Sequence, residues 1–303
     1  MNRHVAVLMG GLSVEREVSL VSGEECARAL ESKGYSVTRI DVGRDLARQL
    51  ETIAPDCVFN ALHGRLGEDG RVQGLLDLMQ IPYTHSGVMA SAIAMDKPMA
   101  IRLFRSAGIR APEGRLCSLA TVLEDPPFAP PYVVKPAAEG SSIGVSIVRD
   151  DDRTALTGRN DLDPKSKVLV ERYIAGCELT CAVLGDRALA VTELSPNRGF
   201  YDYCAKYTAG YAKHLLPAPL EEAVYRQVMD WALLAHRLLG CRGVSRSDFR
   251  YDPQLGKDGL FILEINTQPG MTPLSLVPEQ ALHCGIEFPE LVAGLVEAAQ
   301  CDP

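Results

Sequence analysis

The sequence predicts an α/β protein that opens with a parallel sheet and continues in lobes of the α+β class. Two observations carry this prediction. Strand and helix patterns alternate through the first ninety or so residues, which is typical of a sheet with crossover helices. Proline-rich turns and short antiparallel strand patterns dominate from Pro126 onward. The length of 303 residues allows about two domains.

The elements of the first part follow from apolar runs and helix signals. Gly34 is a typical residue just past a helix end, and Asp96 with Pro98 marks the start of a helix that runs to Ser106. The predicted strands are Val5–Met9, Ser36–Ile40 and Cys57–Ala61, and the predicted helices are Val14–Lys33, Asp45–Thr52 and Val72–Met79.

The later part combines short strands with one strong helix. That helix spans Pro219–Leu239, with acidic residues in its first turn, Gly240 as its stop, and an apolar stripe that includes Trp231 and Leu234 and is expected to be core. The predicted strands are Tyr132–Lys135, Val145–Val148, Lys167–Glu171, Thr180–Leu184 and Ala188–Glu193.

Composition excludes several classes of protein. Thirty-nine acidic against thirty-one basic residues give a net charge of -8, so no broad cationic surface for nucleic acid or anionic lipid is expected. Nine scattered cysteines suit reduced thiols in a cytosol. The apolar run at the amino terminus is too short for a signal peptide, and no 18-residue apolar stretch occurs. We therefore expect a cytoplasmic protein without a membrane role.

The segment from Ser245 to Asn266 predicts a metal site. It reads as two strands joined by a turn at Asp252–Gly259, and side chains alternate along a strand. Arg246 and Asp248 therefore share a face, as do Glu264 and Asn266, opposite Leu263 and Ile265. If the strands pair, these polar groups converge as hard oxygen donors of the kind that Mg²⁺ accepts. The alternative is a solvated hairpin face with a cross-strand ion pair.

Two further segments predict anion binding. In the stretch Lys135–Gly144, small residues and free N–H groups can cover a phosphate beside the lysine, although the Walker spacing is absent and a plain hairpin is the alternative. Gly10–Glu15 joins a strand to a helix, and Glu15 could meet a cationic amine while Ser13 caps the helix. His63 follows a neighbouring strand, where it orients the substrate or Glu15, or is a structural loop residue.

Together these segments resemble the D-alanine–D-alanine ligase family of the ATP-grasp superfamily. The resemblance runs from Gly10 to Pro278 and is carried by eight motifs in the family's order: GGLSVEREVSL, LHGRLGEDG, MDKPMA, VVKPAAEGSSIGVS, VERYIAGCELT, FYDYCAKY, SRSDFRYD and LEINTQPGMTPLSLVP. It implies an ATP-grasp fold preceded by a Rossmann-like domain. The implied division is residues 1–92 with the first D-alanine site, 93–175 with the phosphate-covering loop, and 176–303 with the metal and second D-alanine sites.

The resemblance also implies the nucleotide and metal residues. ATP and two Mg²⁺ per site, which Mn²⁺ can replace, are the expected cofactors. Asp248, Glu264 and Asn266 would hold the metals, with Glu264 bridging them. The residues implied for ATP are Lys97, Lys135 and Lys206 at the phosphates, Glu171 and the Ile174 backbone at adenine, and Glu178 at the ribose.

The implied reaction joins two D-alanines through an acyl phosphate, releasing ADP and phosphate, for peptidoglycan. Glu15 would hold the first ammonium group, with His63 nearby. Arg246 and the Gly270 N–H would form the oxyanion hole, and Ser275 would hold the second carboxylate.

In the family, Ser141 and Tyr207 join Glu15 in a latch that closes the site, together with the segments Gly140–Gly144 and Phe200–Lys213. Tyr207 favours a dipeptide product over the alternative, a D-alanine:D-lactate ligase. A non-catalytic nucleotide sensor is a third possibility, which the intact site residues disfavour. Leu66 stands where many members carry a smaller residue. The family is usually dimeric through its amino-terminal domain, so a homodimer is expected.

Overall fold

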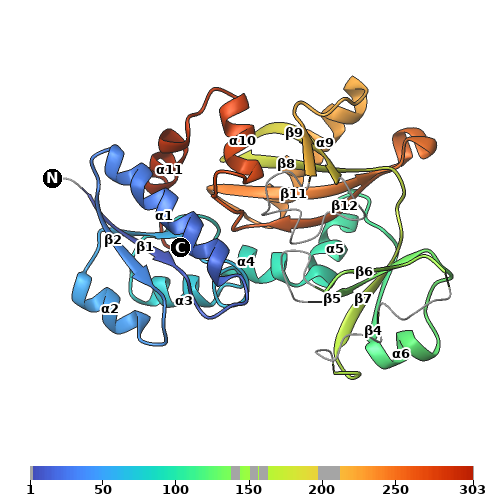
Figure 1. Ribbon diagram of the computed structural model, residues 1–303, viewed down its shortest axis with the longest axis horizontal. Coiled ribbons are helices and arrows are strands. Elements are labelled where there is room, and N and C mark those ends of the chain that lie inside the picture. The colour runs from blue at the N-terminus through green and yellow to red at the C-terminus, as the bar shows by residue number, and fades with distance from the viewer. Residues whose placement is uncertain (1–2, 138–143, 151–155, 157–162, 197–211, 303) are drawn as a thin grey trace.

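The computed structural model describes residues 3–137, 144–150, 156, 163–196 and 212–302. Its strands form three separate sheets, arranged along the long axis of the molecule (Figure 1). The first sheet is parallel and the other two are antiparallel, which confirms the predicted α/β class with α+β lobes.

The parallel sheet has the order β2-β1-β3 and helices on both faces. Side chains of β1 alternate between these faces: Val5 and Val7 face the core shared with α1 and α11, and Ala6 and Leu8 face the core shared with α2 and α3. The bounds are β1 His4–Met9, β2 Ser36–Asp41, β3 Cys57–Asn60, α1 Arg16–Ser32, α2 Leu46–Ile53, α3 Arg71–Leu78 and α11 Phe288–Glu297.

The four-stranded sheet has the order β4-β7-β5-β6, and α6 packs against β4 and β7. Tyr132, Val134 and Val170 fill the core on that face with the buried side chains of α6. The bounds are β4 Gly114–Ser118, α6 Leu119–Glu124, β5 Tyr132–Pro136, β6 Ser146–Val148 and β7 Lys167–Arg172.

The five-stranded sheet has the order β10-β9-β8-β11-β12 and is covered on both faces. Helices α5 and α9 pack on one face, around Phe249 and Ile262, and α10 packs on the other beside Ala182. The bounds are α5 Lys97–Ser106, β8 Cys177–Leu184, β9 Arg187–Pro196, β10 Ala212–Leu215, α9 Glu222–Leu238, β11 Val244–Tyr251, β12 Leu260–Asn266 and α10 Leu276–His283, with a 3₁₀ segment at Pro253–Asp258.

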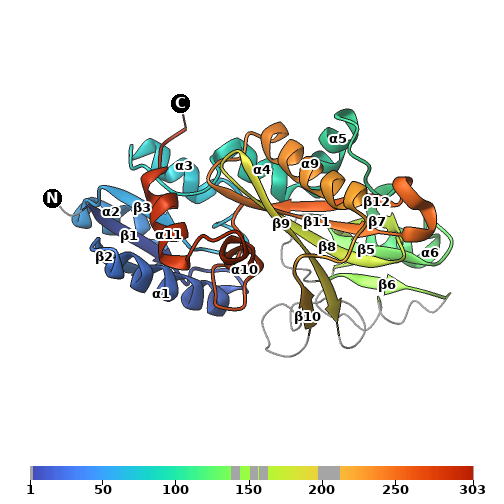
Figure 2. The same ribbon diagram turned by 90° about the horizontal axis from the view of Figure 1, so that it is seen from above.

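The carboxyl-terminal helix α11 packs against elements from the amino-terminal part of the chain. Helix α11 packs along α1 and touches β3, so one apolar core contains side chains from both ends of the chain (Figure 2). Helix α4, Val88–Met95, links the parallel sheet to α5 and contacts β12. The Rossmann-like sheet is therefore held firmly beside the five-stranded sheet.

Several elements were not predicted from sequence. They are α4, β4, α6, β10, α10 and α11. Of the predicted helix signals, Gly34 takes a φ of +86° and the Asp96 carboxylate accepts from the Met99 N–H at 3.0 Å, as expected. The prediction that Leu234 is a core residue is wrong, because its side chain is 40% exposed while Ala232 and Ala235 face the core.

The described cysteines are all free thiols, as expected for reduced side chains. Burial raises the pKa of the Cys57 thiol to about 11, so it stays protonated at neutral pH. Cys204 lies outside the described residues. A membrane-crossing helix of sufficient length and apolarity is not found in the described part of the chain.

Burial on α9 predicts an acid-sensitive stability. His236 is buried with its Nδ1 2.7 Å from Ser245 Oγ, and desolvation lowers its pKa from 6.5 to about 4. Between pH 6.5 and pH 4 this histidine is protonated in the unfolded chain but stays neutral in the folded chain. The free energy of unfolding therefore falls by about 1.4 kcal/mol for each pH unit toward pH 4.

We therefore expect His236→Gln to flatten this acid slope in urea unfolding measured from pH 7 to pH 4. His283→Gln, a change at an exposed histidine, serves as the control and should keep the wild-type slope. An unchanged slope in His236→Gln would contradict the assignment.

Candidate active site

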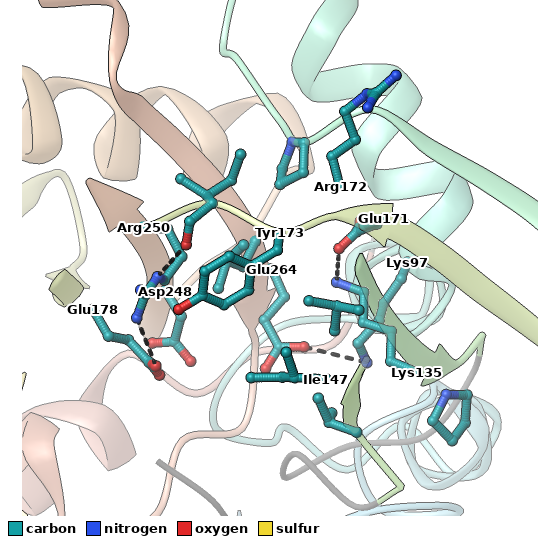
Figure 3. Close-up of a pocket in the computed structure, with 16 residues that line it drawn as sticks. Lys97, Lys135, Ile147, Glu171, Arg172, Tyr173, Glu178, Asp248, Arg250 and Glu264 are labelled. Carbon is teal, nitrogen blue, oxygen red and sulfur yellow. Dashed lines mark hydrogen bonds and ion pairs between the residues drawn. The ribbon is translucent and has the colours of Figure 1, made fainter. Parts of the chain in front are cut away.

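A cleft opens between the two antiparallel sheets (Figure 3). The space within it, with its open mouth included, is about 790 Å³. Its polar lining residues come from α5, β5, β7, β8, β11 and β12, whereas Val133, Ile147 and Leu263 supply apolar walls. Seven of the residues expected from sequence line it: Lys97, Lys135, Glu171, Ile174, Glu178, Asp248 and Glu264.

Four ion pairs lie at this cleft, one on the four-stranded sheet and three on the side of the five-stranded sheet. Their eight side chains are between 3% and 21% exposed, so water screens these charges little. The pairs and their N–O distances are Lys135–Glu171 at 2.7 Å, Lys97–Glu264 at 3.2 Å, Arg246–Asp248 at 2.7 Å and Arg250–Glu178 at 3.8 Å. In these pairs the positive and negative charges at the cleft are equal in number.

The hairpin of β11 and β12 has the pairing expected from sequence. Arg246 lies opposite Asn266, and Asp248 lies opposite Glu264. The expected strict alternation is wrong at one position, because the register shifts by one residue after Asp248. This bulge brings Leu263 to the cleft together with Glu264.

Asp248 is the most constrained carboxylate in the hairpin. Both its oxygens accept from the Arg246 guanidinium, at 2.7 and 2.8 Å, and Thr180 Oγ1 donates to it at 2.7 Å. Both partners of this ion pair are buried and lie on one strand. The alternative of a solvated face with a cross-strand pair is therefore wrong.

Asp248, Glu264 and Asn266 form a donor set that suits a divalent cation. Two carboxylates and one amide are hard oxygen ligands, and both carboxylates already face cationic nitrogens. Asn266 Oδ1 also accepts from the Gln268 N–H at 2.7 Å, which fixes the amide. Among the described residues, no group of three or more His, Cys, Asp or Glu side chains is placed to hold a metal.

Arg250 and Tyr173 are cleft residues that sequence reasoning missed. The Arg250 guanidinium donates to the carbonyls of Ile174 at 3.2 Å and Gly176 at 2.7 Å, and lies 5.8 Å from the Tyr173 ring centre. It fixes the segment between β7 and β8 and leaves the Ile174 N–H for another partner. Its place two residues after Asp248 on one strand was the signal that could have found it.

Glu15 lies beside the parallel sheet and is 2% exposed. Ser13 Oγ accepts from the Glu15 N–H at 3.2 Å and donates to the His63 carbonyl at 2.6 Å. Helix α1 begins at Arg16 with Glu15 in the capping position, so the expected cap position at Ser13 is two residues early, although the Ser13 side chain does accept from an N–H at the helix start. Ser13 also ties the glycine turn to the loop after β3.

His63 is buried and both its ring nitrogens have partners. Nε2 lies 3.1 Å from Ser22 Oγ, and Nδ1 lies 3.4 Å from a Glu68 carboxylate oxygen. Ser22 Oγ in turn accepts from the Met271 N–H at 3.3 Å. His63 is thereby linked to the residue that follows Gly270.

Gln268 makes a second link between the lobes that sequence reasoning missed. Its amide is paired with Asn60 of β3 in both directions, since Gln268 Nε2 donates to the Asn60 carbonyl and Asn60 Nδ2 donates to Gln268 Oε1. Gln268 Nε2 also lies 3.2 Å from His85 Nδ1. The segment between Asn266 and Gly270 is therefore anchored to the parallel sheet.

The remaining expected residues fall into two groups. Gly270 and Ser275 are buried in the segment before α10, where Ser275 Oγ accepts from the Thr272 N–H at 2.9 Å. Ser141, Lys206 and Tyr207 lie outside the described residues. A small hollow lined by Glu68, Lys97, Glu264 and Asn266 connects the loop after β3 with the hairpin.

Comparison with known proteins identifies the family. A model described as "D-ala D-ala ligase C-terminus" matches residues 119–297, and one described as "D-ala D-ala ligase N-terminus" matches residues 42–86. The chain belongs to the D-alanine–D-alanine ligase family.

Relatives and solved structures agree with this membership. The chain is 55% identical to the D-alanine–D-alanine ligase of Methylorubrum populi, over 99% of each protein, and 56% identical to that of Methylocella silvestris, over 100% of each. A Bacillus anthracis D-alanine–D-alanine ligase solved in complex with ATP shares 30% identity and a TM-score of 0.80, covering 98% of this chain and 96% of that one.

Lys135 provides a test of nucleotide binding in the cleft. We expect Lys135→Met to weaken AMP-PNP binding by about ten- to hundredfold, because a charge-assisted contact contributes about 1.5–3 kcal/mol. Calorimetric titration would measure this, with circular dichroism to verify folding because Glu171 loses its partner. Lys257→Met, at an exposed lysine, is the control. Equal affinities in wild type and Lys135→Met would contradict the prediction.

Proposed function

We propose that this cleft and the loops beside the parallel sheet together perform the family's reaction, with the residue roles given below. The protein is an ATP-dependent ligase that joins two D-alanines for peptidoglycan synthesis. The observation that carries the proposed roles is the gathering of seven expected residues around one cleft, with Asn266 in the adjoining hollow.

In the proposed nucleotide site, ATP lies between the four-stranded and five-stranded sheets. Lys97 and Lys135 contact its phosphates, and Lys206 is a third phosphate contact. The Ile174 N–H and Glu171 meet the adenine edge, and Glu178 meets the ribose hydroxyls. The apolar cleft walls support this arrangement, because they can hold a planar base out of water.

In the proposed metal site, Asp248, Glu264 and Asn266 would hold two Mg²⁺ ions, and Mn²⁺ would substitute for them. When bound, the metals would neutralise charge on the transferring phosphoryl group. The lysine and arginine that now face Glu264 and Asp248 support this proposal, since these carboxylates require nearby positive charge.

The first step activates one D-alanine. Glu15 holds its ammonium group, with His63 and Glu68 beside it, and its carboxylate oxygen attacks the γ-phosphorus of ATP. A P–O bond forms as the bond to ADP breaks, giving an acyl phosphate. Lys97 and Lys135 stabilise the charge on the phosphoryl oxygens.

The second step forms the peptide bond. Ser275 holds the carboxylate of the second D-alanine, whose unprotonated amine attacks the acyl carbon. The C–N bond forms, the nitrogen loses a proton, and the C–O bond to phosphate breaks. Arg246 and the Gly270 N–H donate to the oxygen that becomes negative in between. Ser141 and Tyr207 are proposed to latch the closed site with Glu15, which excludes water from the acyl phosphate.

The lobe boundaries, the oligomeric state and the cellular location of the enzyme are also proposals. We place the seams of three lobes at residues 92/93 and 175/176, since each lobe then contains one sheet. A homodimer through the amino-terminal lobe follows from the family resemblance. The free thiols and the use of ATP support a cytoplasmic location.

Glu264 provides the test of the metal assignment. We expect Glu264→Gln to abolish D-alanine-dependent phosphate release while circular dichroism and thermal unfolding stay near wild type, because the side chain lies at the cleft and not in the core. Glu222→Gln, at an exposed glutamate, is the matched control and should turn over normally. Near-normal turnover in Glu264→Gln would refute the metal role.

The alternative D-alanine:D-lactate ligase is not favoured, because the relatives that match nearly the whole chain are D-alanine–D-alanine ligases. With both acceptors present, we expect the dipeptide to dominate at neutral and higher pH, since amine attack requires the unprotonated form. Product analysis by mass spectrometry over a pH series measures this. A depsipeptide majority at pH 8 would support the alternative instead.

A further inference from the structure

A second cavity lies at the carboxyl edge of the parallel sheet, away from the catalytic cleft. It is lined by residues from the loops after all three strands, within 10–13, 42–47 and 62–75, and it shares no lining residue with the cleft. The strand order β2-β1-β3 places the neighbours of β1 on opposite sides, and the crevice beyond such a reversal is where open α/β sheets bind ligands. The cavity has about 930 Å³ of space, its open mouth included.

The charged side chains that line this cavity are all arginines. Arg44, Arg65 and Arg71 line it, whereas no aspartate or glutamate of the described chain does. Arg71 pairs with Asp69, but Arg44 and Arg65 make no hydrogen bond or ion pair with any described residue.

The nearby carboxylates do not neutralise these two arginines. Asp41 is held by Arg16 at 2.6 Å, and Asp45 is held by Arg48 at 2.8 Å. The ring nitrogens of His63, another lining residue, are taken by Ser22 and Glu68. Two guanidinium groups are therefore left facing one cavity without a counter-charge, an arrangement that favours an anion.

The rest of the wall is apolar. Leu46, Leu62 and Val72 are buried at the wall, and Leu12 lines the cavity while remaining 59% exposed. Leu66 lines it too and takes a φ of +76°, a left-handed conformation that a leucine rarely adopts and that is typical of functional loops. A ligand with an apolar body would cover this surface.

Helix α3 adds a polar feature at the same place. Its cap is Gly70, with a φ of +90° and no side-chain hydrogen bond, and its first residues, Arg71 and Val72, line the cavity. The Asp69 carboxylate already accepts from the Arg71 N–H at 3.3 Å, so this helix start has a negative charge of its own. The features that favour a ligand here are therefore the two unpaired arginines and the leucine walls.

We propose that this cavity is an accessory binding site for a small organic anion with an apolar chain, of the medium-chain carboxylate class. Its carboxylate meets Arg44 and Arg65, and its chain lies along the leucine walls. Because the cavity shares no lining residue with the cleft, we expect it to be occupied without displacing ATP, although His63 lines it and also stands in the proposed first D-alanine site.

The probe is sodium octanoate, titrated calorimetrically into the full-length protein with saturating AMP-PNP in the cleft. We expect one saturable site, and we expect the double variant Arg44→Gln/Arg65→Gln to weaken octanoate binding at least about tenfold, since it removes two charge-assisted contacts. Both side chains are exposed and unpartnered, so the variant should fold. Arg102→Gln on α5 removes one exposed positive charge elsewhere and should bind as wild type.

Two further probes separate charge from chain. Octanol retains the chain without the charge, and inorganic phosphate retains charge without the chain, so both should bind more weakly than octanoate. The proposal is overturned by the absence of saturable octanoate binding, by equal affinity in wild type and the double variant, or by displacement of octanoate by AMP-PNP.

Discussion

The catalytic cleft depends on one constraint, the mutual neutralisation of eight charges that are buried or largely buried. Each carboxylate on the cleft wall has a lysine or arginine partner, and water screens the most buried of these pairs, Lys135–Glu171, very little. Buried ion pairs contribute little net stability compared with apolar packing of equal volume. Four such pairs around a single cleft are therefore better explained by the ligand than by the fold. In the proposed mechanism they hold cations for the phosphates and carboxylates for the metal ions, in a chain whose net charge is -8.

The fold brings these ion-pair partners together from different helices and strands. Glu178 and Arg250 come from neighbouring strands of the five-stranded sheet, whereas Lys97 reaches Glu264 from the helix that packs beside that sheet. The Lys135–Glu171 pair stands on the opposing sheet (Figure 3). The parallel sheet is joined to this assembly by the Gln268–Asn60 amide pair and by the chain from His63 through Ser22 to Met271. The loops proposed to bind the amino acid are thereby held beside the proposed phosphate site.

Local sequence signals predicted Lys135 and the hairpin residues at the cleft, whereas Lys97, Glu171, Ile174 and Glu178 were expected from the family resemblance alone. Alternation along two strands predicted that Arg246 and Asp248 face Glu264 and Asn266, and the pairing confirmed it. What alternation could not supply was the bulge that turns Leu263 into the cleft, since a register shift depends on tertiary packing. The alternation pattern also could not predict the ion-pair partners, because residues such as Lys97 and Glu264 are distant in sequence and meet only in the folded chain. Helices such as α10 and α11 were missed for the same reason, because their partner surfaces lie on other sheets.

The central claim is that cations hold the acidic donors in place until nucleotide and metal arrive. The most direct test is anomalous diffraction from crystals of the protein grown with AMP-PNP and Mn²⁺. The account predicts two manganese peaks contacting Asp248, Glu264 and Asn266, with Lys97 no longer paired to Glu264. Manganese bound elsewhere, or a nucleotide-filled cleft in which Arg246 and Lys97 alone still hold both carboxylates, would contradict it.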